Sequence, residues 1–289
     1  MNDQIDRIGN NSLIQHGEHN KRVYLMKLDP ADVDKITSLL TGLARGYGYT
    51  KIFCKVPDWA APRFFADGYV MEGMVPGFYA GTATACFMSK FLNSDRLLGM
   101  EDQQMKDYSK LLEEYAGIKV QSEGPEGLSD IERLTANDAE EITSVFKEVF
   151  ISYPFPIHDP EYIRKTMNEN IIYFGMKKGG KLIAVSSAEI DFEGRNVEMT
   201  DFATLPEARG RGMAGTLLQK MEYEMNEEGI LTFYTIARLN SFPMNRTFLR
   251  RGYQYAGTLI NNTNIAGDIE SMNVLYKPNY GTTNIRKGA

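Results

Sequence analysis

The sequence predicts an α/β (α+β) protein with a mixed, mostly antiparallel sheet flanked by helices, in which a smaller N-terminal α/β unit precedes a larger C-terminal domain. Three features support this prediction. Residues 196–229 pass from an apolar, β-branched run through a glycine- and arginine-rich turn into a segment of helical period. Residues 171–177 and 181–190 flank Lys178-Gly179-Gly180, which indicates a β-hairpin. Residues 122–127 form the best linker in the chain.

Length and composition limit the classes of function. With 289 residues, the chain is long enough for two domains and an ample core. The net charge of -6 argues against a nucleic-acid partner, because phosphate binding needs a basic surface. No apolar run approaches the roughly 18 residues of a membrane span, and the polar first residues argue against a signal peptide. Cys54 and Cys86 lack a metal-type spacing, so we expect no metal, a reducing compartment and a cytoplasmic location.

The elements of the N-terminal part follow from hydrophobic period and turn residues. Residues 1–21 are polar and without a period, and we expect them to be irregular. Asp29 and Pro30 then mark a helix start, as N-cap and first helical residue. The N-terminal unit covers 22–121, and its expected elements are a strand at 22–28, a helix ending at Gly46 to Gly48, a strand at 49–56, a short helix at 57–66, strands at 69–79 and 82–91, and a helix at 101–115.

The C-terminal domain covers 131–280, after a linker at 122–130 and before a tail at 281–289. Thr135 and Asp138 suit a capping box in front of a helix with an apolar face. The expected order is β-α-α-β-β-β-α-β-α-β-β: a strand from 131, that helix, a helix from 160, the two hairpin strands, a strand at 197–205, a helix at 212–229, a strand at 230–237, a helix near 244–250, and strands at 253–260 and 271–277.

The turn between the strand at 197–205 and the following helix has the properties of an anion site. A helix N-terminus presents unpaired N–H groups and a partial positive charge, and both favour phosphate. Arg209 and Arg211 add full charges that can pair with phosphate oxygens. The turn is not a Walker loop, because no Gly-Lys-Ser/Thr follows. It is not a dinucleotide fingerprint either, because the βαβ partner with its acidic residue is missing.

The turn fits the pattern R-x-x-G-x-A at Arg209, Gly212 and Ala214, and in this it resembles the pyrophosphate-binding signature of the GNAT superfamily of acyl-CoA N-acyltransferases. The element order over 131–280 is also similar to a GNAT domain. The resemblance implies acetyl-CoA as cosubstrate, with cofactor amides pairing along the strand before the turn and the diphosphate held by the amides of the turn. The implied cofactor-binding residues are Phe202, Ala203, Thr204, Leu205, Arg209, Gly210, Arg211, Gly212, Met213, Ala214, Gly215, Asn240 and Asn245.

The two parts of the chain share a short internal sequence similarity. Residues 64–69 followed by Glu72-Gly73 resemble residues 248–253 followed by Ala256-Gly257, and each follows a strand and a short helix. The N-terminal unit therefore resembles a partial GNAT half without the glycine- and arginine-rich turn. The alternative is chance, because Gly-aromatic turns after helices are common.

Two acids precede the turn and are the catalytic candidates. Glu198 and Asp201 lie three residues apart on one strand, so we expect their side chains on opposite faces. Glu198 stands eleven residues before Arg209, where some GNAT members carry a catalytic glutamate. The alternative for Glu198 is a solvated position on a strand edge. Phe248 occupies the position at which many GNAT enzymes have a tyrosine that acts as general acid toward the leaving thiolate. Phenylalanine cannot donate a proton, so water, Tyr253 or another residue would be the acid, if one is needed.

Residues 153–160 lie between the first two helices of the C-terminal domain, where GNAT enzymes form the acceptor pocket. Together with Trp59, Asn261-Asn262 and residues 272–277, this segment resembles the β-lysine N-acetyltransferases, which acetylate the terminal amine of β-lysine (3,6-diaminohexanoate) and so make a compatible solute. The resemblance implies direct attack in a ternary complex, an apolar channel, acids for the ammonium groups and an arginine for the carboxylate. The substrate-binding candidates are Tyr153, Phe155, Asp159 and Arg238, with Arg251 as a second arginine.

Two other functions are compatible with the same residues. Another diamine or a polyamine could be the acceptor, which the acidic composition permits. A non-catalytic acyl-CoA-binding sensor is the alternative from a different class, and Phe248 favours it. The expected partner is a small-molecule amine, with neither nucleic acid nor membrane, and a homodimer is compatible with the sequence.

Overall fold

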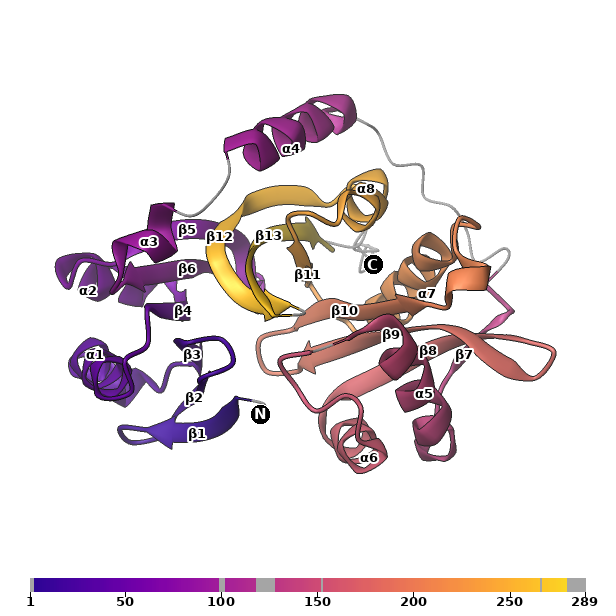
Figure 1. The fold of residues 1–289 in the computed structure, drawn as a ribbon, viewed down its shortest axis with the longest axis horizontal. Helices are drawn as coiled ribbons and strands as arrows, with labels where there is room; N and C mark the ends of the chain where they lie inside the picture. The colour runs from indigo at the N-terminus through magenta and orange to yellow at the C-terminus, as the bar shows by residue number, and fades with distance from the viewer. Residues whose placement is uncertain (1–2, 99–101, 118–127, 152, 266, 280–289) are drawn as a thin grey trace, which may run out of the picture.

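The computed structural model describes residues 3–98, 102–117, 128–151, 153–265 and 267–279 (Figure 1). These residues form a 13-stranded sheet in the order β1-β2-β3-β4-β6-β5-β12-β13-β11-β10-β9-β8-β7. The tail at 281–289 and most of the linker at 122–130 lie outside the described residues. In the part of the chain that the structure describes, no helix has the length and apolar character needed to cross a membrane.

The N-terminal half of the sheet and its helices run as far as the gap at 99–101. Its elements are β1 (Gln4–Ile8), β2 (Ser12–Gly17), β3 (Arg22–Lys27), α1 (Ile36–Gly46), β4 (Lys51–Pro57), α2 (Ala61–Ala66), β5 (Val70–Tyr79), β6 (Ala83–Phe91) and α3 (Ser94–Leu98). As the sequence predicts, Asp29 caps the turn before α1, because its carboxylate accepts a hydrogen bond from the amide of Ala31.

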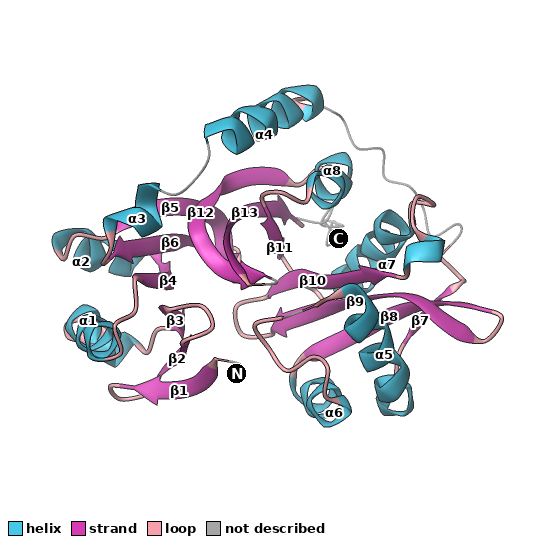
Figure 2. Ribbon diagram, viewed as in Figure 1, coloured by secondary structure: helices cyan, strands magenta, loops and turns pink. Residues whose placement is uncertain are grey.

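The C-terminal domain follows the order of elements that the sequence predicts, which confirms the fold class. After α4 (Asp102–Tyr115), the elements are β7 (Ile131–Arg133), α5 (Ala139–Val149), α6 (Pro160–Glu169), β8 (Ile171–Lys178), β9 (Lys181–Asp191), β10 (Asn196–Thr204), α7 (Met213–Glu227), β11 (Thr232–Arg238), α8 (Phe242–Arg250), β12 (Gln254–Ile265) and β13 (Asp268–Pro278). Helices α5 and α6 cover one face of this half of the sheet, and α7 covers the other (Figure 2).

The irregular start expected for residues 1–21 is wrong, because β1 and β2 form an antiparallel hairpin at the edge of the sheet. Strand β1 is almost wholly exposed, and the buried side chains of β2 are mostly polar, with Ile14 as the apolar exception. The hydroxyl of Ser12 donates to Asp32 at 2.7 Å, and the ring of His16 hydrogen-bonds the Tyr49 hydroxyl at 3.2 Å. Because partners from other segments satisfy these polar groups, the strand shows no hydrophobic period.

Helix α4, expected within the N-terminal unit, packs instead against α8 of the C-terminal domain (Figure 1). The rings of Tyr108 and Tyr255 are 5.5 Å apart, and Arg250 donates to the hydroxyl of Tyr115 at 3.0 Å. The boundary expected at residue 121 therefore does not separate the two cores, because α4 is part of the C-terminal core although it precedes the linker.

The sheet order is nearly symmetrical about the junction of β5 and β12. On one side, β3 and β4 pair in parallel, followed by β6 and β5; on the other, β10 and β11 pair in parallel, followed by β13 and β12. Gly73 of β5 lies directly opposite Gly257 of β12. These two glycines end the two segments whose sequences resemble one another, so the topology agrees with a repeated half-fold.

The glycine pair at this junction carries a stability prediction. A Cβ on Gly257 would lie 2.0 Å from the carbonyl oxygen of Glu72 and 2.5 Å from Cα of Gly73. We expect Gly257→Ala to lower the free energy of unfolding by at least about 2 kcal/mol, measured by urea denaturation. Gly267→Ala is the control, because Gly267 also has a positive φ but no heavy atom within 4 Å. Equal unfolding midpoints for the two variants would contradict the tight junction.

Candidate active site

The turn at residues 209–215, here called the glycine–arginine turn, leaves backbone donors free. Gly210 and Gly212 have φ of 77° and 75°, in the region that favours glycine, and Gly212 directly precedes α7. Among the described residues, no acceptor bonds the amides of residues 210–214. A Cβ on either glycine would meet no heavy atom within 4 Å. The positive end of α7 thus faces open space with several unpaired N–H groups.

Two arginines flank this open helix end. Both Arg209 and Arg211 are exposed. The Nε of Arg209 donates to the carbonyl oxygen of Thr204 at 3.1 Å, which ties the turn to the end of β10 and leaves the rest of the guanidinium facing solvent. The predicted anion-binding features of the turn therefore lie together on one surface.

Strand β10 separates from β11 beside this turn. The two strands pair in parallel only at Asn196, Val197 and Glu198, opposite residues 232–234. Strand β10 then continues to Thr204 and β11 to Arg238 without further pairing between them (Figure 2). Residues 199–204 therefore present a backbone edge toward β11 that has no strand partner there, next to the open amides of the turn.

The expectation that Glu198 and Asp201 point to opposite faces is wrong. The pairing of β10 with β9 shifts register between Thr200 and Ala203, and Asp201 has φ of 53°. This bulge breaks the alternation of side chains along the strand. Asp201 accepts a hydrogen bond at 2.5 Å from the hydroxyl of Ser187, which lies opposite Thr200 and on the same face as Glu198. Both acids consequently lie on one face of the sheet.

Glu189, Glu198 and Asp201, here called the acidic cluster, are half-buried on β9 and β10. Burial and then the Glu189 carboxylate raise the pKa of Glu198 to about 7, and the Lys55 ammonium and a hydrogen bond from Tyr234 partly offset the rise. Burial likewise raises the pKa values of Glu189 and Asp201. A carboxyl that titrates near neutral pH is suited to accept a proton from a reacting group.

The proline-rich segment supplies one contact to this cluster. The Tyr153 hydroxyl donates to Asp201, and burial raises the pKa of Tyr153 well above its ordinary value, so the phenol stays neutral. Phe155 packs at the edge of the core formed by α5 and α6. Asp159 lies elsewhere: it is exposed and caps α6, accepting from the amide of Glu161 at 3.0 Å. Its predicted role toward an ammonium group is therefore replaced by helix capping.

The structure gives Asn245 a structural role. Its side chain is fully buried, donates to the carbonyl oxygens of Arg238 and Ser241 at 2.9 Å each, and accepts from Asn273 at 3.0 Å. The predicted cofactor contact of Asn245 is wrong for this reason, whereas Asn240 is exposed between β11 and α8 and its role stays a prediction.

The two arginines expected to bind a carboxylate already have carboxylate partners. The guanidinium of Arg238 donates to both oxygens of Glu270, at 2.8 and 2.6 Å. Arg251 pairs with Glu222 at 2.9 Å. A carboxylate already balances the charge of each arginine, which weakens its attraction for a substrate carboxylate, so neither position favours the predicted role.

Phe248 and Tyr253 are buried in the core. Phe248 is 1% exposed and Tyr253 is 3% exposed, with ring centroids 4.9 Å apart. Phe248 also meets Phe202 of β10 edge to face at 5.6 Å. Phe248 thus supports the strand beside the turn, and Tyr253, as placed here, does not reach the surface where an acid would act.

Lys55 is a further residue at this site that the sequence did not single out. It lies on β4 of the N-terminal unit, and its ammonium donates to the Tyr234 hydroxyl at 3.2 Å. Burial works against its charge, but nearby acidic groups, Tyr234 and Glu198 among them, hold the pKa of Lys55 well above its ordinary value. The available signal was a lysine within an otherwise apolar strand.

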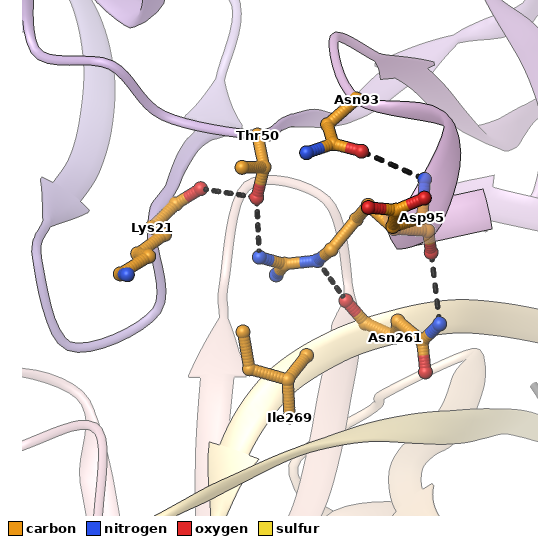
Figure 3. Close-up of a pocket in the computed structure, with 7 residues that line it drawn as sticks. Lys21, Thr50, Asn93, Asp95, Asn261 and Ile269 are labelled. Carbon is orange, nitrogen blue, oxygen red and sulfur yellow. Dashed lines mark hydrogen bonds between the residues drawn. The ribbon is translucent and has the colours of Figure 1, made fainter. Parts of the chain in front are cut away.

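A separate cavity of about 320 Å³ lies at the junction between the N-terminal unit and β12 (Figure 3). Its lining residues are Lys21, Thr50, Asn93, Asp95, Arg96, Asn261 and Ile269. The guanidinium of Arg96 bonds the carbonyl oxygen of Asn261 at 2.6 Å and the hydroxyl of Thr50 at 2.7 Å. The cavity shares no residue with the acidic cluster or the glycine–arginine turn, and its central cation is occupied in joining two segments of the fold.

Comparisons with known proteins agree with this geometry. A family model described as Acetyltransferase (GNAT) family matches residues 139–253. The β-lysine N(6)-acetyltransferase of Methanococcus maripaludis is 38% identical, over 93% of this chain and 96% of that protein. The N-acetyltransferase YodP of Bacillus subtilis is 32% identical, over 94% and 98%, and the β-lysine N(6)-acetyltransferase of Methanosarcina mazei is 30% identical, over 83% and 96%. Since two of these relatives match over nearly the full length of both chains, the protein belongs to the GNAT family, whose members use acetyl-CoA, and is an N-acetyltransferase.

Proposed function

We propose that this N-acetyltransferase transfers the acetyl group of acetyl-CoA to the terminal (N6) amine of β-lysine. Two of the relatives reported above are β-lysine N(6)-acetyltransferases, and the similarity to them includes the N-terminal unit as well as the GNAT domain. The product keeps one ammonium and one carboxylate group, so it is zwitterionic with no net charge. Such a product suits a compatible solute, and osmoadaptation is the physiological role that we propose.

The cofactor would lie along β10 and over the glycine–arginine turn. The unpaired amides of the turn would hold the diphosphate, with Arg209 and Arg211 adding charge. The unpaired backbone edge of Phe202 to Leu205 would pair with the amides of the pantetheine arm. This arrangement aims the thioester at the point where β10 and β11 separate, beside Glu198.

Glu198 would serve as the general base. An alkylammonium has a pKa of about 10.4, so only a small fraction is neutral at pH 7. The Glu198 carboxylate, directly or through water, would take a proton from the ammonium. The amine nitrogen then forms a bond to the thioester carbonyl carbon while the carbon–sulfur bond breaks. The nitrogen releases its second proton to solvent as the amide forms, and the CoA thiolate leaves and takes up a proton from solvent. Both cysteines are buried, so the acetyl group would pass directly to the amine rather than through a thiol.

The single observation that carries the choice of acceptor is the acidic cluster beside this open edge. A diamino acid at neutral pH has two ammonium groups, and one base cannot neutralise both. Glu189 and Asp201 lie on the same face as Glu198 and are the groups proposed to hold the second ammonium. Tyr153 orients Asp201 through its hydrogen bond, and Phe155 contributes apolar surface nearby.

The test is an assay of thiol release from acetyl-CoA with β-lysine, α-lysine, spermidine and putrescine as acceptors, followed by NMR of the product. We expect the highest kcat/KM with β-lysine and acetylation at N6. Release with spermidine alone would favour a polyamine acceptor. Binding of acetyl-CoA without amine-dependent release would favour a sensor. The cytoplasmic location and the homodimer stay predictions, and size-exclusion chromatography with light scattering tests the second.

A further inference from the structure

We propose that Lys55 of the N-terminal unit binds the carboxylate of the acceptor and thereby selects an amino acid over a simple diamine. This role, which rests on the proposed function, gives the unit without a glycine–arginine turn a part in substrate choice. The observation behind it is a half-buried ammonium group at the site that has acidic groups nearby but forms no ion pair within 4 Å among the described residues.

The Lys55 ammonium has hydrogen-bond donors without a partner among the described residues. An ammonium has three donors, and the one hydrogen bond that Lys55 makes among the described residues goes to the Tyr234 hydroxyl at 3.2 Å. Its nitrogen lies 5.4 Å from the ring centres of Phe78 and Tyr234, which favour a cation but form no salt bridge. No carboxylate of the described residues lies within 4 Å of this nitrogen. A bound carboxylate would supply the missing partner.

The other candidate cations are already paired. Lys51, on the same strand, donates to Glu72 at 2.8 Å and to the carbonyl oxygen of Ile260 at 2.7 Å. The two arginines predicted for the carboxylate pair with Glu270 and Glu222 in the same way. Lys55 differs because its nearest acidic groups form no ion pair with it.

Tyr234 connects the position of Lys55 with that of the proposed base. Tyr234 is the residue of β11 directly opposite Glu198 in the parallel pairing, and the same Tyr234 accepts the hydrogen bond from Lys55. Lys55 of the N-terminal unit and Glu198 of the C-terminal domain therefore both lie next to Tyr234. This charge pattern is complementary to a substrate with one carboxylate and two ammonium groups.

The experiment compares two acceptors that differ only in the carboxylate: β-lysine and pentane-1,4-diamine. For Lys55→Met we expect kcat/KM with β-lysine to fall by about 30- to 100-fold, mainly through KM, because one charged contact is lost. The value with pentane-1,4-diamine should change by less than about 3-fold. Lys55→Arg should recover part of the preference for β-lysine, since it restores the charge. Lys27→Met, at an exposed lysine of the neighbouring strand, should leave both values unchanged.

The outcomes separate this inference from the function beneath it. If the wild-type enzyme does not acetylate β-lysine, the proposed function fails and the inference fails with it. If the wild type acetylates β-lysine and Lys55→Met loses activity equally toward both acceptors, the inference alone is overturned. Affinity for acetyl-CoA checks that each variant is folded. If Lys55→Met does not fold, Lys55→Gln enters the same comparison, and an unchanged ratio of the two kcat/KM values for that variant overturns the inference.

Discussion

Gly212→Asp is expected to lower the affinity for acetyl-CoA by at least about 100-fold, measured by isothermal titration calorimetry. Gly212 directly precedes α7, and its φ of 75° places it where the amides of the turn face open space. An aspartate there would cap α7 with its own carboxylate and repel a diphosphate. Because aspartate tolerates this backbone conformation better than most residues and is a good N-cap, the variant should remain folded.

Gly180→Asp is the matched control for this substitution. Gly180 lies in the hairpin between β8 and β9, has φ of 78°, and likewise has no heavy atom within 4 Å of a built Cβ. The substitution Gly180→Asp makes the same change from glycine to a charged residue at a positive φ, but away from the glycine–arginine turn. Equal acetyl-CoA affinity in the two variants would contradict binding of the diphosphate at the glycine–arginine turn. The proposed placement of the thioester would then fail as well.

Glu198→Gln is expected to lower kcat by about 100- to 1,000-fold, the range for loss of a general base. Glutamine keeps the size of the side chain and its hydrogen bonding but cannot accept the proton of the ammonium. Glu193→Gln serves as the control, because Glu193 is exposed and pairs only with Lys27 at the surface. Full activity of Glu198→Gln would transfer the role of base to another member of the acidic cluster.

The pH dependence of kcat/KM tests the role of Glu198 as general base independently. Burial and Glu189 raise the pKa of Glu198 to about 7, and the carboxylate is the form that accepts a proton. Wild-type kcat/KM should therefore rise with pH and level off above about 7, while the acceptor remains an ammonium up to about pH 10. In Glu198→Gln, the rate should follow the free amine and keep rising toward pH 10. An inflection near 7 in that variant would contradict the assignment.

Local sequence signals were sufficient for most of the C-terminal domain. The capping box of Thr135 and Asp138 and the glycines of the turn act within a few residues, so their effect does not depend on the rest of the fold. The hairpin of β1 and β2 was missed because its buried side chains, Ile14 apart, are polar. Their partners come from distant segments, as when Gln15 donates to the carbonyl oxygen of Pro154 at 3.3 Å.

The acidic cluster could be predicted only in part. Glu198 and Asp201 were named from their positions before the turn, but the bulge that puts them on one face depends on the register with β9 and on Ser187 and Tyr153. Glu189 was not named at all, because its nearness to Glu198 arises from strand pairing. The error for Asn245 has the same origin, since its three partners lie on β11, before α8 and on β13.

The sequence by itself determined the order of elements in the C-terminal domain, the open helix end at the glycine–arginine turn and, through them, the acetyltransferase family. Caps, glycine conformations and hydrophobic periods are properties of short segments, so they can be read locally. Only the tertiary structure decided which charges meet. Lys55 and Glu198 lie far apart in the chain, and four strands separate β4 from β11 in the sheet. Glu198 lies beside Tyr234 through strand pairing, whereas Lys55 reaches Tyr234 because side chains from both halves of the sheet pack into one shared core. Strand pairing, one bulge and the packing of the two halves bring such groups together, and none of these can be inferred from residues considered a few at a time.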